Sequence, residues 1–172
     1  STVKYVFTVV YAFVMLMLQF FLAPSITFAG IGPDFIIIFI VSITPYFAAA
    51  SLPMQALFLG TAFDLTASGG IFINTASYFV ISGGMCLYKL LGFGDEFIAQ
   101  LTAAAAAVLI KGVLSVIGLY ITGLTQSISF VFFLKFIPSA LYTAVFLIPF
   151  FFLFRLLMNI HIGRDDGKTI IG

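Results

Sequence analysis

Residues 97–121 read FIAQLTAAAAAVLIKGVLSVIGLYI, and Lys111 is the only charged residue in this stretch. A membrane-spanning helix needs about 20 predominantly apolar residues, so the stretch predicts a transmembrane helix. The rest of the chain has the same character, with 63% hydrophobic residues, 8% charged residues and a mean hydropathy of +1.27. Soluble domains carry roughly 25% charged residues. The composition therefore predicts an integral membrane protein, whose excess apolar surface is covered by lipid.

Apolar runs separated by Gly, Pro and polar clusters divide the chain into about six transmembrane helices. We expect one all-α transmembrane domain over residues 1–172, because no stretch resembles a linker. Its expected helices are 5–23, 34–50, 54–66, 71–91, 97–121 and 136–158, followed by a polar tail over 159–172. Pro24 should end the first helix, and Pro45 should kink or shorten the second. Four or five spans, with the third segment re-entrant, remain an alternative.

Basic residues predict the orientation, because short cytoplasmic loops are enriched in Lys and Arg. Six spans would place both termini on one side of the membrane. That side would hold Lys4, Lys89, Arg155, Arg164 and Lys168, and the opposite side only Lys135. We therefore expect both termini in the cytoplasm.

Two charged residues fall within apolar helices and are the strongest candidates for a site. Asp64 lies one helical turn after Gly60, and Lys111 lies near the middle of the 97–121 helix. A charge at the centre of a membrane helix costs about 2.5–3.5 kcal/mol on insertion scales, so each should find a partner or water. One hypothesis is that Asp64 and Lys111 face the same interior and pair. A structural Asp64 near an interface is the alternative.

Three other polar residues have structural interpretations. Asp34 precedes a run of isoleucines, and an Asp at a helix N-terminus accepts backbone N–H bonds and complements the helix dipole. Asn74 and Tyr78 are four residues apart and share one helix face. That face could line a polar cavity or form hydrogen bonds between helices.

Residues typical of catalysis are scarce. His161 is the only histidine and lies in the polar tail, and Cys86 is the only cysteine. The chain has no Walker A or Gly-x-Ser-x-Gly motif, and no carboxylate pair within one span. We expect no catalytic, metal or cofactor site. The net charge of +1 and the absence of a basic stripe predict no nucleic-acid partner.

Three short motifs carry a family resemblance. They are Pro33-Asp34 before Phe35-Ile36-Ile37-Ile38, Gly60-x-x-x-Asp64-Leu65, and Gly70-Ile71-x-x-Asn74-x-x-x-Tyr78. In order and setting they resemble the MreD family of bacterial rod shape-determining membrane proteins. The resemblance covers roughly residues 30–78, and beyond it only length and hydropathy agree.

The resemblance implies a non-catalytic scaffold of the cell-elongation machinery in the bacterial cytoplasmic (inner) membrane. Its expected partners are an MreC-like single-span membrane protein, cell-wall synthesis enzymes and MreB-type filaments, with a homo-oligomer left open. The candidate partner-binding or structural polar residues are Asp64, Gly60, Lys111, Asn74, Tyr78 and Asp34. The family is also similar in helix number to the substrate-binding subunits of energy-coupling-factor vitamin transporters. A vitamin-capture subunit is therefore the alternative function.

Overall fold

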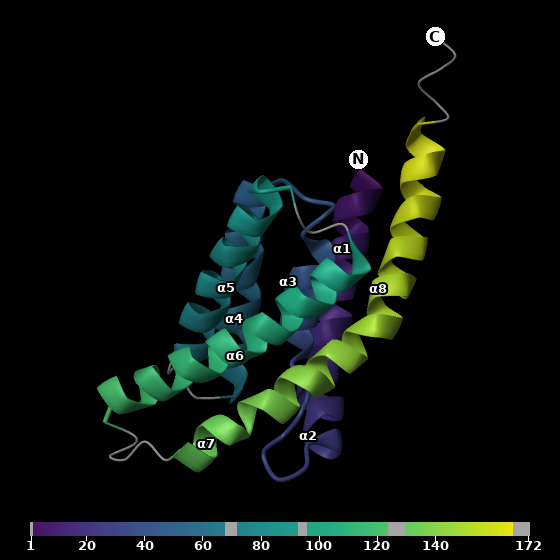
Figure 1. Cartoon of the computed structure of the whole chain (residues 1–172). Helices are drawn as coiled ribbons and strands as arrows, with labels where there is room; N and C mark the ends of the chain where they lie inside the picture. The colour runs from purple at the N-terminus through teal and green to yellow at the C-terminus, as the bar shows by residue number, and fades with distance from the viewer. Residues whose placement is uncertain (1, 68–71, 93–95, 124–129, 167–172) are drawn as a thin grey trace.

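The computed structural model is a bundle of helices packed around one short, buried helix (Figure 1). It describes residues 2–67, 72–92, 96–123 and 130–166. The helices are α1 (Thr2–Met17), α2 (Ala23–Ile26), α3 (Phe35–Ile43), α4 (Leu52–Ala67), α5 (Ile73–Leu90), α6 (Phe97–Ile121), α7 (Phe130–Leu134) and α8 (Phe136–Asp166). The predicted all-α class is confirmed for the described residues.

Three helical stretches of the described chain are long and apolar enough to cross a membrane. They are Thr2–Ile26, Phe97–Ile121 and Phe136–Asn159. Many large apolar side chains on these stretches are exposed, as expected of surfaces that face lipid. α3, α4 and α5 are shorter or more polar and fall outside this set.

The first helix does not end at Pro24, so that prediction was wrong. α1 continues through a π-helical turn, Leu18–Leu22, directly into α2, which ends at Ile26. Proline has no backbone N–H and clashes with the carbonyl four residues earlier. The turn before Pro24 is one residue wider than an α-helical turn, and Ala23 N–H bonds to the Leu18 carbonyl five residues back. The wide turn carries the helix past the proline.

The second expected helix, 34–50, is much shorter in the structure. α3 ends at Ile43, before Pro45, and a 3₁₀ turn (Ala49–Ser51) then leads into α4. The early end expected from Pro45 is thus confirmed. Nine residues of α-helix are only about 14 Å long, less than half of the roughly 30 Å hydrocarbon layer.

α3 forms the centre of the fold. All nine of its residues are buried, and it contacts α1, α4, α5, α6 and α8. A helix that is apolar on every side must be buried in this way. Its two ends therefore lie inside the bundle, where their unpaired backbone groups need partners from other helices.

The remaining boundaries agree with the sequence except at the C-terminal end. α6 covers 97–121 as predicted, while α4 and α5 differ from 54–66 and 71–91 by one or two residues; residue 71 lies outside the described residues. α8 runs to Asp166, so the expected helix end at 158 was wrong; residues 167–172 of the predicted polar tail are not described. Hydropathy marks where a helix leaves lipid, and a helix can continue into water beyond that point. Pro149 lies inside α8, which changes direction along its length (Figure 1).

Candidate functional site

The N-terminus of α3 carries the capping group expected from the sequence. The Asp34 carboxylate accepts hydrogen bonds from the backbone N–H groups of Ile36 and Ile37, both at 3.1 Å. This geometry is an N-cap, and the negative charge also complements the helix dipole. The Asp34 prediction is therefore confirmed, but the carboxylate does more than cap.

Asp34 is also the partner of the intramembrane lysine. Lys111 Nζ of α6 forms an ion pair with Asp34 Oδ2. Lys111 also donates to the Tyr78 hydroxyl at 2.7 Å, and that hydroxyl donates to Asp34 Oδ2 at 3.0 Å. Lys111 Nζ lies 4.6 Å from the centre of the Tyr78 ring. The three side chains join α3, α5 and α6 at one point in the bundle.

The hypothesis that Lys111 pairs with Asp64 was thus wrong about the partner. Helical spacing predicts that a charge faces the interior but not which helix supplies its counter-ion. One available signal was that α3 is apolar on all sides. A buried helix has a buried N-cap, and a buried carboxylate needs a cation.

Asp64 instead joins α4 to the beginning of α5. Its Oδ1 accepts from Asn74 Nδ2 at 2.8 Å, and its Oδ2 accepts from Thr75 N and Thr75 Oγ1, both at 2.7 Å. The residue is fully buried. Asn74 and Tyr78 do share one face, and each bonds a different carboxylate, Asp64 for the first and Asp34 for the second.

Gly60 makes this contact between α4 and α5 possible. A Cβ at this position would lie 2.8 Å from the backbone Cα of Thr75 and 3.2 Å from the Tyr78 ring. Small residues allow helix backbones to approach closely in membranes. Gly60 therefore has a packing role beside both polar groups.

Three further polar residues at the ends of α3 were not singled out from the sequence. Phe35 N–H donates to Gln19 Oε1 at 2.8 Å, and Asp34 N–H donates to Thr143 Oγ1 at 3.1 Å. At the other end, Lys89 Nζ donates to the carbonyls of Thr44 at 2.8 Å and Pro45 at 3.2 Å, and to that of Phe47. The three carbonyls use all three donors of the ammonium group.

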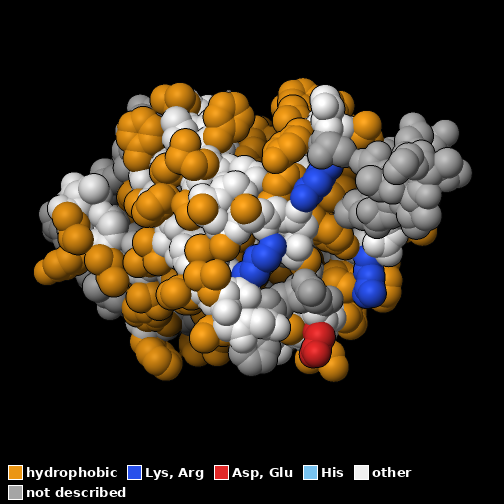
Figure 2. Space-filling view, turned by 90° about the horizontal axis from the view of Figure 1, so that it is seen from above, with side chains coloured by type: hydrophobic (Ala, Val, Ile, Leu, Met, Phe, Trp, Pro, Cys, Tyr) orange, Lys and Arg blue, Asp and Glu red, His pale blue; other side chains and the backbone are white. Residues whose placement is uncertain are grey.

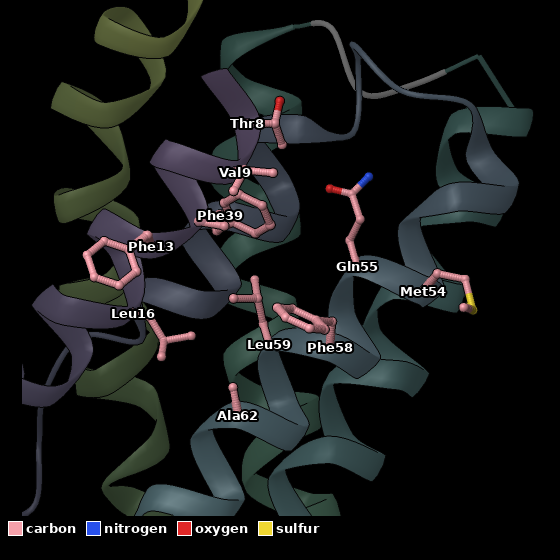
Figure 3. Close-up of a pocket in the computed structure, with 11 residues that line it drawn as sticks. Thr8, Val9, Phe13, Leu16, Phe39, Met54, Gln55, Phe58, Leu59 and Ala62 are labelled. Carbon is pink, nitrogen blue, oxygen red and sulfur yellow. The ribbon is translucent and has the colours of Figure 1, made fainter. Parts of the chain in front are cut away.

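An apolar groove runs along the outside of this core. It has a volume of about 460 Å³ and lies between α1 and α4, with Phe39 of α3 among the residues that line it (Figure 3). Thr8 and Gln55 are its only lining residues with polar side chains. Phe13 and Phe58 also line it and are 63% and 77% exposed. The groove is thus suited to binding apolar groups rather than a hydrophilic small molecule.

The chain was compared with protein-family models, with curated proteins and with solved structures, and none of them matches it. Asp34, Tyr78 and Lys111 satisfy one another, and Asp64 is bonded to Asn74 and Thr75. These polar groups hold helices together, and the α1–α4 groove is lined mainly by apolar side chains.

Proposed function

We propose that this chain is a non-catalytic membrane scaffold that seats the transmembrane helix of a partner protein in the α1–α4 groove. The observation that carries the proposal is the contrast between the two parts of the bundle. The intramembrane charges Asp34, Asp64 and Lys111 are engaged in contacts between helices, whereas the groove presents apolar side chains to the membrane. An apolar groove between two helices accepts the side-chain ridges of a third.

The motif resemblance supports a more specific form of the proposal. In that form the chain is an MreD-like component of the bacterial cell-elongation machinery. Its partner is an MreC-like single-span protein, and the wider assembly includes cell-wall synthesis enzymes and MreB-type filaments. Gly60, Asp64, Asn74 and Tyr78 belong to the motifs and set how α4 packs on α5. Since α4 is one wall of the groove, these residues would act on partner binding through groove shape.

The proposed topology has six membrane-embedded helical segments in the bacterial inner membrane, with both termini in the cytoplasm. α1 begins and α8 ends at the same end of the bundle (Figure 1). Figure 2 looks onto that end and shows Lys and Arg side chains among apolar ones. An excess of basic residues on one side supports a cytoplasmic location for it.

Co-purification tests this function. The full chain and an MreC-like protein would be expressed together and purified through a tag on this chain. Phe58→Ala and Phe13→Ala should reduce recovery of the partner, because each removes an aromatic ring from the groove. Phe79→Ala is the matched control, since Phe79 is 45% exposed on α5 and does not line the groove.

Equal recovery of the partner with all three variants would show that the groove is not its binding site. No recovery of the partner with the unaltered chain would refute the scaffold function. A vitamin-capture subunit would give a different result. It would bind no MreC-like partner and would be stabilised against heat by a vitamin.

A further inference from the structure

A second, more polar pocket lies apart from the α1–α4 groove. It has a volume of about 250 Å³ and is formed by the segment after α3, the start of α6 and the second half of α8. Its lining residues are Pro45, Tyr46, Gln100, Phe151, Arg155 and Asn159. None of them belongs to the ion pair of Asp34 or to the bonds of Asp64, so neither of those clusters explains the pocket.

Arg155 gives this pocket an anion-binding group. Its guanidinium lies 5.8 Å from the centre of the Phe151 ring. Among the side chains that the structure describes, which exclude those of residues 160–172, no carboxylate forms an ion pair with it, and the ion pair found joins Lys111 to Asp34. Asn159 is one helical turn further along α8, so its amide shares the face of the guanidinium. A guanidinium beside amide donors matches the oxygens of a phosphate group.

The position of the pocket fits the level of lipid headgroups. Arg155 and Asn159 lie at the end of the apolar stretch Phe136–Asn159, where a spanning helix leaves the hydrocarbon layer. Phe152 and Leu156 directly follow the lining residues Phe151 and Arg155 in α8, and they are 56% and 59% exposed. Apolar side chains next to the pocket favour a ligand that carries acyl chains over a free phosphate ester. The Lys and Arg side chains at this end also attract anions (Figure 2).

We infer that the pocket of Arg155 binds the phosphate headgroup of an anionic phospholipid. The guanidinium holds two phosphate oxygens, Asn159 contributes an amide N–H, and the acyl chains lie along Phe152 and Leu156. The site is independent of the groove between α1 and α4 and of any partner protein. Binding of anionic lipid would also fix how deeply this end of the bundle sits at the membrane surface.

Native mass spectrometry of the full chain in neutral detergent tests the inference. Phosphatidylglycerol and phosphatidylcholine, which carry similar acyl chains and differ in headgroup charge, are the two probes. The unaltered chain should retain phosphatidylglycerol in preference. Arg155→Gln should weaken that binding by about five- to tenfold, and Arg155→Lys should weaken it less, because the charge remains but the planar fork is lost.

Lys4→Gln is the matched control, because it removes one positive charge from the same end of the bundle but outside the pocket. It should weaken lipid retention much less than Arg155→Gln does. Equal losses in Arg155→Gln and Lys4→Gln would overturn the inference, since only general electrostatic attraction would remain. Retention of both lipids alike would also overturn it. Soluble glycerol phosphate separates the two sources of phosphate, and binding of this ester without retention of phosphatidylglycerol would overturn the assignment to lipid.

Discussion

Asp34 and Lys89 stand at opposite ends of α3 and bond its two termini. The Asp34 carboxylate accepts hydrogen bonds from the N–H groups of Ile36 and Ile37. The Lys89 ammonium donates hydrogen bonds to the carbonyls of Thr44, Pro45 and Phe47. Each charge has the sign that complements the helix dipole at its own end. A short apolar helix can therefore be buried among five others without leaving its ends unbonded.

The ion pair of Lys111 with Asp34 should show strong coupling. Lys111→Met leaves a buried carboxylate without its cation and should lower the free energy of unfolding by about 3 kcal/mol. Asp34→Asn should also destabilise the protein, and the double variant should lose much less than the sum of the two. Unfolding in a mild detergent, followed by circular dichroism, measures all three. Lys135→Met is the control, because Lys135 is exposed and makes no ion pair with a described residue. Additive losses would show that the pair is not coupled.

Gly60 should tolerate no side chain. Gly60→Ala places a Cβ 2.8 Å from the Thr75 backbone, and separating α4 from α5 should cost about 1–3 kcal/mol. Gly83→Ala is the matched control, because a Cβ there meets no atom within 4 Å. It should raise stability by about 0.5–1 kcal/mol through helix propensity. Thermal unfolding of both variants measures the difference, and equal midpoints would contradict the packing role of Gly60.

The contribution of Asp64 to stability should depend on its charge and not only on its shape. Asp64→Asn keeps the size of the side chain but turns one acceptor into a donor that faces other donors. The loss should be about 1–3 kcal/mol, the cost of an unsatisfied buried polar group. Thr75→Val removes one hydroxyl donor and should cost less. A double-mutant cycle between these two changes should give a coupling energy, and its absence would show that the bonds do not contribute.

Replacement of Lys89, even by arginine, should destabilise the C-terminal end of α3. Lys89→Met leaves the carbonyls at the end of α3 without their donor. Lys89→Arg keeps the charge, but a planar fork does not direct its donors as an ammonium does. Both should destabilise the end of α3, and amide hydrogen exchange at residues 40–47 measures the effect. Unchanged exchange in Lys89→Met would show that the ammonium does not hold this end.

The sequence allowed much of the helical layout to be predicted, because apolar length and proline positions act locally. The limits of α6 and the early end before Pro45 depend on nothing outside their own segments. The predicted end of the first helix at Pro24 was wrong because a π-helical turn, which hydropathy does not reveal, accommodates the proline.

The polar sites were predicted less well, because they depend on contacts between distant segments. Asp34 could be recognised as a cap from its neighbours, but its bond to Lys111 joins residues 77 positions apart. Lys89 entered the predicted orientation only as a basic residue, and its partners are backbone carbonyls, which no side-chain pattern reveals. Gln19 and Thr143 were missed for the same reason, since both bond backbone groups of another segment.

The length of α3 has a consequence for how the protein is made. At about 14 Å, the helix is too short to be inserted as a span by itself. Its N-terminal counter-ion comes from α6 and its C-terminal donor from α5, both of which follow it in the chain. α3 is therefore synthesised before Lys89 and Lys111, the two lysines that act at its ends. During biogenesis α3 can reach its final packing only after α5 and α6 have been synthesised. A chain truncated before α6 would therefore lack a folded centre.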